Sequence, residues 1–297
     1  MEKRPEGNAV VRERGLAYDD FKRRYLNAGQ PVILTDAIKD WPALTKWTPE
    51  FFANQHGDRT VEIEGRSYTL REVVAGVLDP ARAKTPYMRN KDIDRLVPEL
   101  MADIEPHPIY CSPNWLDGPF SWGLHRDFRK GSWQLYIGGP GMGFPHLHYD
   151  LGRTHAFLMQ IYGRKRFMMY APADTPYLYP WENIPNLSLI EDLERPDLER
   201  FQLFPKAVRY ECELGPGDTI FVPGGWWHTT KIEMPCITVS FNIANASNWS
   251  AFIREQCRAL SPRAKLKRAG YLHLLRIVRT ALETSHRLAD RGSDAKV

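Results

Sequence analysis

Short segments in which polar and apolar residues alternate dominate the second half of this 297-residue chain. Glycine and proline separate these segments, for example at 215–217 and 223–225, and such breaks are typical of strands joined by turns. The segments that predict strands are 133–137, 155–162, 166–170, 207–213, 219–222 and 236–242. Many short strands of this kind favour a mainly β domain with flanking helices, folded as a double-stranded β-helix, or jelly roll.

The regions around these strands carry other signals. A short amphipathic helix is predicted at 20–26 and a strand at 31–35. Thr48 followed by Pro49 is an N-cap signature, so we expect a helix to begin there. The irregular run at 176–205 is long for a loop inside a compact domain, and loops of this length are usually functional.

The C-terminal segment differs from the rest of the chain in charge and in periodicity. Residues 251–297 hold 11 Lys/Arg against 4 Asp/Glu, whereas residues 1–250 hold 29 against 32. A helix is predicted at 271–282, and the residues on its apolar side are Leu272, Leu275, Val278 and Leu282. We therefore expect a domain at 1–250, which includes a mixed α/β N-terminal region, followed by a basic helical segment at 251–297.

Two interpretations of this C-terminal segment stay open. Its apolar side either packs on the barrel of the same chain or forms a two-fold interface in a homodimer, and we favour the homodimer. The basic stretch at 263–268 is either a solvated surface or a contact for RNA or an acidic protein, and we favour the solvated surface. The net charge of the whole chain is only +4, which gives no strong argument for nucleic acid.

Location is suggested by three further features. The charged N-terminus lacks the apolar core of a secretory signal. No apolar run approaches the roughly 18–20 residues that cross a bilayer. The four cysteines form no Cys-x-x-Cys pair and match no zinc-binding spacing. We expect a cytoplasmic protein without a membrane segment.

Two histidines and one aspartate form the most informative side-chain pattern. His148 and Asp150 stand two residues apart in a strand-like run, so their side chains point to the same side. His228 lies 80 residues further along, after the turn at 223–225. Two imidazoles and one carboxylate on one face of a divalent metal are the facial triad of non-haem Fe(II) oxygenases, which leaves coordination positions open for other ligands. The sequence predicts a metal site at these three residues.

Other histidines are weaker candidates. His125 and Asp127 also form a His-x-Asp pair, but they lie in an irregular segment before the strands, so we interpret them as part of an ordered loop. His146 shares the predicted inward side with His148 but lacks a carboxylate two residues later, so it is expected behind the ligands or facing the substrate. His155 is close in sequence, and the pattern does not decide which way it faces.

The chain resembles the JmjC and cupin-like 2-oxoglutarate oxygenases, and in particular the small protein-hydroxylase branch that includes the asparaginyl hydroxylase of hypoxia-inducible factor. The resemblance covers roughly residues 15–250. It rests on the segments 30–36 with 40–42, 148–150, 160–166, 195–201 and 216–228. The fold that it implies is the cupin or JmjC form of the double-stranded β-helix.

The resemblance also implies the cofactors and the residues that hold them. Fe(II) would be bound by His148, Asp150 and His228, and Lys165 would bind the distal carboxylate of 2-oxoglutarate. Tyr110 matches a tyrosine that helps at the same carboxylate in relatives. A buried carboxylate must be paired and hydrogen-bonded, which agrees with a lysine and hydroxyl groups at this position.

Three departures from the family pattern affect this co-substrate pocket. Pro145 stands where many relatives have threonine or serine, and the segment 151–155 is about two residues longer than theirs and lacks their asparagine. Thr154 is expected to supply the missing hydrogen bond. Relatives often end the last core strand with asparagine or tryptophan, whereas here Ser240 and Asn242 are the residues available.

From these observations we expect an Fe(II)- and 2-oxoglutarate-dependent oxygenase that consumes dioxygen and releases succinate and CO₂. Its substrate would be a protein, a peptide, a tRNA base or a small molecule, and hydroxylation is favoured over demethylation by analogy with the family. The alternatives are a metal-binding cupin that is not an oxygenase, either an isomerase-like zinc or manganese enzyme or a binding module, and an interaction protein without catalysis. Four tryptophans either line a substrate channel or pack in the core; they are Trp115, Trp122, Trp226 and Trp227.

Overall fold

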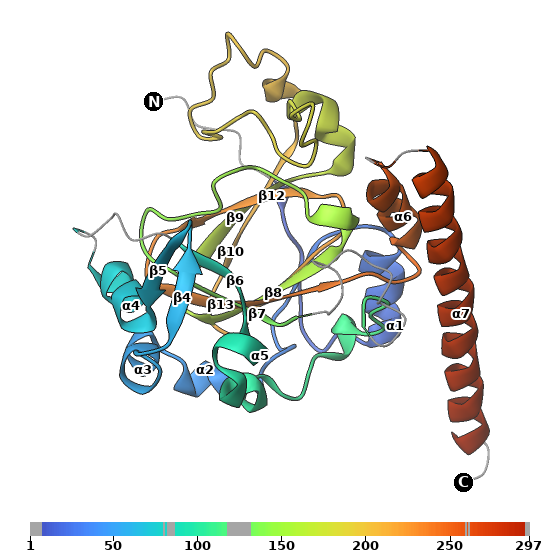
Figure 1. The fold of residues 1–297 in the computed structure, drawn as a ribbon, viewed down its shortest axis with the longest axis horizontal. Coiled ribbons are helices and arrows are strands. Elements are labelled where there is room, and N and C mark those ends of the chain that lie inside the picture. Colours follow the sequence, from blue (N-terminus) through green and yellow to red (C-terminus); the bar gives the residue numbers. More distant parts are fainter. Residues whose placement is uncertain are drawn as a thin grey trace.

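Strands of two β-sheets form the centre of the protein in the computed structural model (Figure 1). The structure describes residues 8–79, 81, 87–117, 132–258, 260 and 262–294, with side chains up to residue 281. The strands are β1 Asn8–Ala9, β2 Arg12–Glu13, β3 Val32–Leu34, β4 Thr60–Ile63, β5 Arg66–Thr69, β6 Met88–Asp92, β7 Gln134–Gly138, β8 His155–Tyr162, β9 Lys165–Tyr170, β10 Arg209–Leu214, β11 Thr219–Val222, β12 Trp227–Ile232 and β13 Cys236–Ile243.

Helices flank these strands. The α-helices are α1 Tyr18–Phe21, α2 Ala43–Lys46, α3 Pro49–Gln55, α4 Leu70–Leu78, α5 Ile93–Leu96, α6 Trp249–Cys257 and α7 Pro262–Asp294. A π-helical turn, η1 Lys22–Leu26, continues α1, and the 3₁₀ turns are η3 Pro98–Ile104, η4 Ile109–Cys111, η7 Leu151–Arg153, η8 Pro172–Tyr177 and η9 Phe204–Lys206. The Thr48 cap is confirmed, because its side chain accepts a hydrogen bond from the Phe51 amide at 3.1 Å.

The larger sheet has the strand order β2-β3-β11-β8-β13-β7-β6, and the smaller sheet has the order β1-β10-β9-β12. The central pairs β8–β13, β9–β12 and β9–β10 are all antiparallel. Together with the flanking helices this confirms the expected jelly-roll architecture. All six predicted strands are present, with ends within two residues of the expected ones.

The main core lies between the larger sheet and the N-terminal helices. Phe21 of α1 makes edge-to-face contacts with Phe221 of β11 at 5.0 Å between ring centroids, and both side chains are fully buried. Trp47 and Phe52 continue this cluster at α3. The mixed N-terminal region therefore covers one face of the barrel and holds the strands that carry the site.

The segment between β9 and β10, which contains the predicted long loop, projects above the barrel in Figure 1. It has its own apolar cluster, in which Leu178, Ile190 and Phe204 pack with Trp227 of β12. Its backbone also contacts the barrel, because the Ser188 amide donates to the Leu147 carbonyl at 2.9 Å. The long loop is thus a structured wall of the domain.

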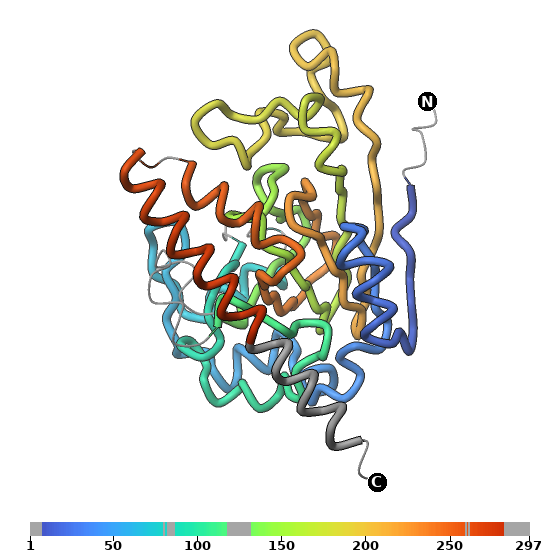
Figure 2. The backbone as a smooth tube through the Cα atoms, turned by 90° about the vertical axis from the view of Figure 1, so that its right-hand side faces the viewer, coloured from blue at the N-terminus to red at the C-terminus, as the bar shows by residue number. Residues whose placement is uncertain are grey.

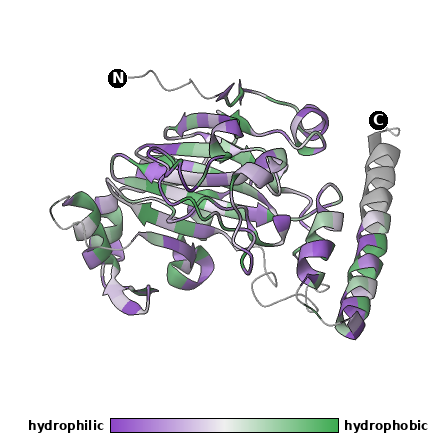
Figure 3. Ribbon diagram, turned by 90° about the horizontal axis from the view of Figure 1, so that it is seen from above, coloured by the Kyte–Doolittle hydropathy of each residue, from purple (hydrophilic) through white to green (hydrophobic). Residues whose placement is uncertain are grey.

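Helices α6 and α7 lie side by side across one face of the molecule (Figure 2). Leu272 and Leu275 of α7 are buried against α6, whereas Leu266, Leu274 and Ile277 are exposed. In Figure 3 hydrophobic and hydrophilic residues alternate along the coloured part of α7. The apolar side therefore packs at least in part on the same chain, and the homodimer stays a prediction. No described helix combines the length and apolar character needed to span a bilayer.

Trp249 joins the C-terminal helices to the domain. Its fully buried ring stacks on Phe252, contacts Trp115 edge to face, and donates from Nε1 to the Leu272 carbonyl at 2.9 Å. We expect Trp249→Ala to lower the free energy of unfolding by about 3–5 kcal/mol, measured by urea denaturation, because it removes a large core side chain. Exposed Trp181→Ala is the matched control, and an equal loss there would contradict this role.

Candidate metal centre and co-substrate pocket

Two strand-like segments bring His148 and His228 together. The amide of each residue donates to the carbonyl of the other, at 3.1 Å from His148 and 2.6 Å from His228. Directly opposite residues of an antiparallel pair point to the same face, and the two imidazole centroids lie 4.4 Å apart. The backbone therefore sets the position of both rings before any metal binds.

Hydrogen bonds to carbonyls orient the two imidazoles. Nδ1 of His148 lies 3.1 Å from the His146 carbonyl, and Nδ1 of His228 lies 3.0 Å from the Trp226 carbonyl. A carbonyl can only accept, so each Nδ1 carries the proton and each Nε2 presents a lone pair. Ligating histidines in proteins are commonly oriented in this way.

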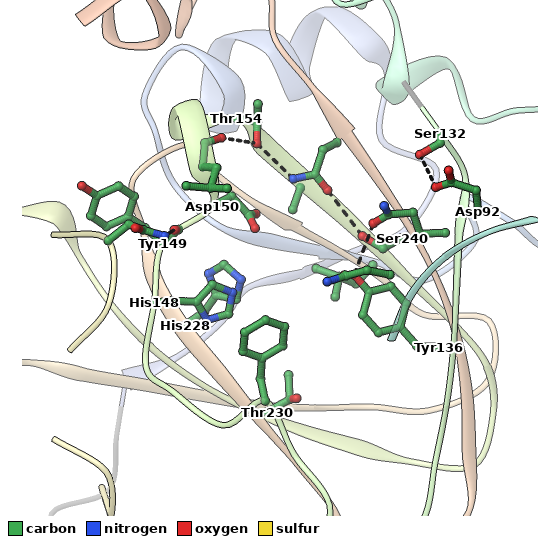
Figure 4. A pocket seen from close by; sticks show the side chains of 18 of the residues that line it. Asp92, Ser132, Tyr136, His148, Tyr149, Asp150, Thr154, His228, Thr230 and Ser240 are labelled. Atoms are coloured by element: carbon green, nitrogen blue, oxygen red, sulfur yellow. Dashed lines mark hydrogen bonds between the residues drawn. The ribbon is translucent and has the colours of Figure 1, made fainter. Parts of the chain in front are cut away.

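Asp150 completes the group. One carboxylate oxygen of Asp150 and one ring nitrogen of each histidine all lie within 4.8 Å of one another. Figure 4 shows the aspartate above the two histidines, with its carboxylate on their side of the segment. The structure thus brings the three predicted ligands together, although they come from distant parts of the sequence.

The protonation states suit a cation. Burial, and then the charge of His228, lower the pKa of His148 well below its ordinary value, so this imidazole is neutral near pH 7. Burial raises the pKa of Asp150, while His228 and a hydrogen bond from Asn242 act in the opposite direction. A divalent ion between these groups would favour the ionised carboxylate, which links metal binding to proton release.

The sequence pattern does not single out Phe144, which supports one ligand. Its ring stacks on His148 with centroids 3.9 Å apart and planes at 17°. The guanidinium of Arg89 lies over the Phe144 ring, 4.7 Å from its centroid. This stack restricts rotation of the His148 ring on the side facing the cavity.

Lys165 lies at the start of β9 and is 1% exposed. Its ammonium donates to the hydroxyls of Tyr87 at 2.9 Å and Thr238 at 2.8 Å. Within the described residues no ion pair includes Lys165, and burial lowers its pKa. A buried cation that has only neutral partners is a strong site for an anion.

The turn before β9 requires glycine. Gly163 has φ +68°, and a Cβ there would lie 1.9 Å from the Pro235 carbonyl oxygen. The close approach brings the β8–β9 turn onto the segment that leads into β13. Lys165 therefore enters the cavity beside Thr238 of β13.

Three residues that surround Lys165 were not predicted from the sequence: Tyr87, Tyr136 and Thr238. A signal existed for Thr238, because residues 238, 240 and 242 alternate on one side of a strand. Tyr136 faces Thr238 across the β7–β13 pair. Tyr87 precedes a polar strand without alternation, so no local pattern pairs it with Lys165.

The remaining predicted pocket residues form one chain of hydrogen bonds. The Asn242 amide donates to the Thr154 hydroxyl at 3.0 Å, and that hydroxyl donates to the Leu151 carbonyl at 3.3 Å. Ser240 lies 3.5 Å from the Asn242 side-chain oxygen. All three residues line the cavity, and Figure 4 shows the chain leading from Thr154 toward Ser240.

Tyr110 is not brought into the pocket. Its ring packs on Phe21 at 5.1 Å between centroids, and its hydroxyl donates to the Leu16 carbonyl. It is absent from the residues that line the cavity, whereas Tyr87 is among them. The expected tyrosine partner of Lys165 is therefore Tyr87, because Tyr110 lies in the core beneath the barrel.

This difference can be measured with one matched pair of variants. We expect Tyr87→Phe to weaken 2-oxoglutarate binding about tenfold, because it removes a hydroxyl at the lysine. Tyr110→Phe should leave that affinity unchanged and lower the free energy of unfolding by about 1 kcal/mol. Calorimetric titration and thermal unfolding provide the two readings. Weaker binding only in the Tyr110 variant would contradict the assignment.

The other histidines lie outside the ligand group. The carbonyl of His146 orients His148, but its own ring packs near Trp181 and does not line the cavity. His155 is buried, and its ring bonds the Ser247 hydroxyl at 2.8 Å and the Gly224 amide at 2.9 Å. Burial lowers the pKa of His155 to about 3. The pair His125 and Asp127 lies outside the described residues.

Of the two alternatives for the four tryptophans, the structure shows core packing wherever it describes them. Trp226 is buried and donates to the Gly29 carbonyl at 2.8 Å, and Trp227 donates to the Thr175 hydroxyl at 2.9 Å. Trp115 packs on Trp249. None of these three lines the cavity, and Trp122 lies outside the described residues.

The cavity that contains both the triad and Lys165 has a volume of about 760 Å³. This is within the range of small-molecule sites, roughly 300–1,000 Å³. Asn186 and Leu187 of the projecting segment form part of its wall. Its outer lining is polar and includes Asn90, Asp92 and Gln134.

The fold and the donor set together define a class of protein. A jelly roll with two histidines and one carboxylate at its open centre, beside a buried cation, is the arrangement of the cupin-type non-haem metal proteins. This chain belongs to the family of cupin-like domains, whose sequence model matches residues 18–254.

Three relatives show the range of this family. Jumonji C domain-containing protein 5 of Drosophila melanogaster is 32% identical over 241 residues, which are 75% of this chain and 57% of the relative. Lysine-specific demethylase 8 of Xenopus tropicalis is 31% identical over 237 residues, 75% of this chain and 50% of the relative. The tRNA wybutosine-synthesizing protein 5 of Gallus gallus is 27% identical over 260 residues, 77% of this chain and 73% of the relative.

These comparisons confirm the JmjC and cupin-like family, and they do not support the narrower asparaginyl-hydroxylase branch. The chain spans between half and three fifths of the length of the first two relatives. Members of the family use Fe(II) and 2-oxoglutarate, and the residues here fit both. The triad supplies hard and borderline donors for the metal, and Lys165 supplies the cation for a carboxylate.

Proposed function

We propose that this protein is an Fe(II)- and 2-oxoglutarate-dependent oxygenase that hydroxylates a side chain of a protein or peptide, or a small molecule. The observation that supports this proposal is the presence of two features in one cavity. One is a preorganised group of three metal ligands, and the other is a buried ammonium with neutral partners. A site that bound only a metal would not need a buried ammonium beside it.

Each group of the chain has a role in this proposal. Iron, when bound, activates dioxygen with electrons from the oxidative decarboxylation of 2-oxoglutarate to succinate and CO₂. His148, Asp150 and His228 hold the metal and leave its other positions open. Lys165, Tyr87 and Thr238 orient the distal carboxylate of the co-substrate toward it.

The walls of the cavity position the substrate and limit the access of water. Phe144 covers one side of His148, and Leu187 closes the wall formed by the projecting segment. The polar outer lining, which includes Asp92 hydrogen-bonded by Ser132 at 2.7 Å, suits a substrate with hydrogen-bonding groups. The names of two of these relatives refer to lysine and to tRNA, so they do not indicate one substrate for this chain.

Succinate release tests this proposal. With Fe(II), 2-oxoglutarate and dioxygen, we expect slow succinate formation even without a substrate, and faster formation with the correct one. Asp150→Ala should abolish both, because the metal loses its charged ligand. Binding of 2-oxoglutarate should be measured separately without oxygen. A protein that retains zinc or manganese and has no affinity for 2-oxoglutarate would support the non-oxygenase cupin instead.

A further inference from the structure

A second hollow of about 480 Å³ lies where the segment after Asp150 meets the C-terminal helices. The described residues that line it are all charged: Arg153, Arg254, Glu255, Arg258 and Lys265. We call this site the basic hollow. It is separate from the metal centre, and no step proposed above uses it.

Positive charge is in excess in the basic hollow. Glu255 accepts from Nε of Arg153 at 3.1 Å and pairs with Arg258 at 3.5 Å, so one carboxylate serves two guanidinium groups. No ion pair within the described part of the chain includes Arg254 or Lys265. Four cations therefore face one anion, and residues 251–281 contain no acidic residue besides Glu255.

Arg153 is held in place before any ligand binds. Its backbone is left-handed, with φ +51°, and its carbonyl accepts a hydrogen bond from the side-chain amide of Asn248 at 3.0 Å. Its guanidinium lies over the Tyr149 ring at 4.5 Å and bonds Glu255 through Nε alone. Within the described residues neither Nη group has a hydrogen-bond acceptor, so both remain available to a ligand.

The chemistry of the lining selects the kind of ligand. The described lining residues are all charged, which suits a charged ligand better than a hydrophobic one. Arginine forks bind carboxylate and phosphate oxygens well. A local surplus of three positive charges matches a phosphate group, which carries about −1.5 to −2 at pH 7 as a monoester, better than one carboxylate.

We propose that the basic hollow is a binding site for a phosphate group. This proposal does not depend on the oxygenase reaction, because it rests on the charges and contacts around Arg153. The site shares a wall with the catalytic cavity: Tyr149 lines that cavity, and its ring carries the Arg153 guanidinium. A phosphate bound here would lie on the outer side of the segment that carries Asp150.

Two exposed lysines of α7 provide a matched test. Lys265 lines the basic hollow, whereas Lys267, two residues away on the same helix, does not. We expect full-length protein at low ionic strength to bind inorganic phosphate in calorimetric titrations. Lys265→Gln should weaken this binding about threefold to tenfold, and Lys267→Gln should leave it unchanged. Glu255→Gln should tighten it, because it removes the one competing carboxylate.

A second titration identifies the source of the phosphate. A short single-stranded RNA bound with the same dependence on Lys265 would support a phosphate carried by a polynucleotide, and binding of inorganic phosphate alone would support a small phosphorylated compound. The proposal is overturned if neither probe binds. It is also overturned if Lys265→Gln and Lys267→Gln weaken binding equally, because that result shows diffuse attraction to a basic helix. Far-ultraviolet circular dichroism of each variant confirms that it is folded.

Discussion

Replacing His228 with alanine is expected to lower the affinity for Fe(II) by at least about 100-fold and to abolish succinate formation. Loss of a hydrogen-bond partner behind a ligand already costs about 10- to 100-fold in metal affinity, and loss of the ligand itself costs more. His148 and Asp150 would remain, but two protein ligands do not retain iron against buffer and water. Competition titration with a metal indicator measures the affinity, and mass spectrometry measures succinate.

His146→Ala is the matched control for this variant. This variant also removes an imidazole close to the metal centre, and the His146 side chain is half-buried. The ring nitrogens of His146 are not among the three converging ligand atoms. Because its backbone carbonyl still accepts from His148, the metal affinity should stay within about threefold of that of the wild type. If His146→Ala lost the metal while His228→Ala kept it, the proposed ligand set would be wrong.

The second large effect concerns Lys165. We expect Lys165→Met, which keeps the length of the side chain and removes its charge, to weaken 2-oxoglutarate binding at least about 100-fold. A carboxylate that loses its only cation and a charged hydrogen bond in a buried pocket loses roughly 3 kcal/mol. The measurement is titration of 2-oxoglutarate in the absence of oxygen, with Lys206→Met on the surface as the control. An unchanged dissociation constant would remove Lys165 from the pocket.

The same variant should make the ligand-free protein more stable. Burial lowers the pKa of Lys165 below its ordinary value of 10.5, so the unfolded chain binds this proton more tightly than the folded protein does. The free energy of unfolding therefore increases with pH between the folded and the unfolded pKa of Lys165, and below the folded pKa it stays at its lowered level. Lys165→Met should remove this dependence and raise the melting temperature at neutral pH. The difference in stability between Lys165→Met and the wild type should therefore shrink as pH rises toward 10, and a difference that stays constant would contradict this explanation.

Local pattern was sufficient to predict the strands and the metal ligands. Side chains two residues apart in an extended segment point to the same side, and this gives the facing of His148 and Asp150, although neither residue belongs to a strand. The third ligand, His228, was predicted from a turn followed by a strand, and that strand is β12. These features are encoded by neighbouring residues, and for this reason they can be derived from the sequence.

The partners of Lys165 are not encoded in this way. Tyr87 lies 78 residues before the lysine and meets it only because β6 pairs at the edge of the larger sheet. The strand that follows Tyr87 is polar and irregular, with a register shift between Met88 and Lys91, so periodicity does not predict it. Tyr110 fits the sequence pattern equally well, but the packing of α1 against η4 places it in the core.

The projecting segment between β9 and β10 connects the shape of the cavity wall with the position of the metal ligands. Leu187 lines the cavity and also forms a backbone bridge to His148, and Asn186 accepts a hydrogen bond from the Tyr149 amide. A lineage that remodelled this segment to admit a new substrate would thereby move the polypeptide that carries two iron ligands. A change of substrate by this route is therefore expected to exchange side chains of the segment while its main chain keeps the same path.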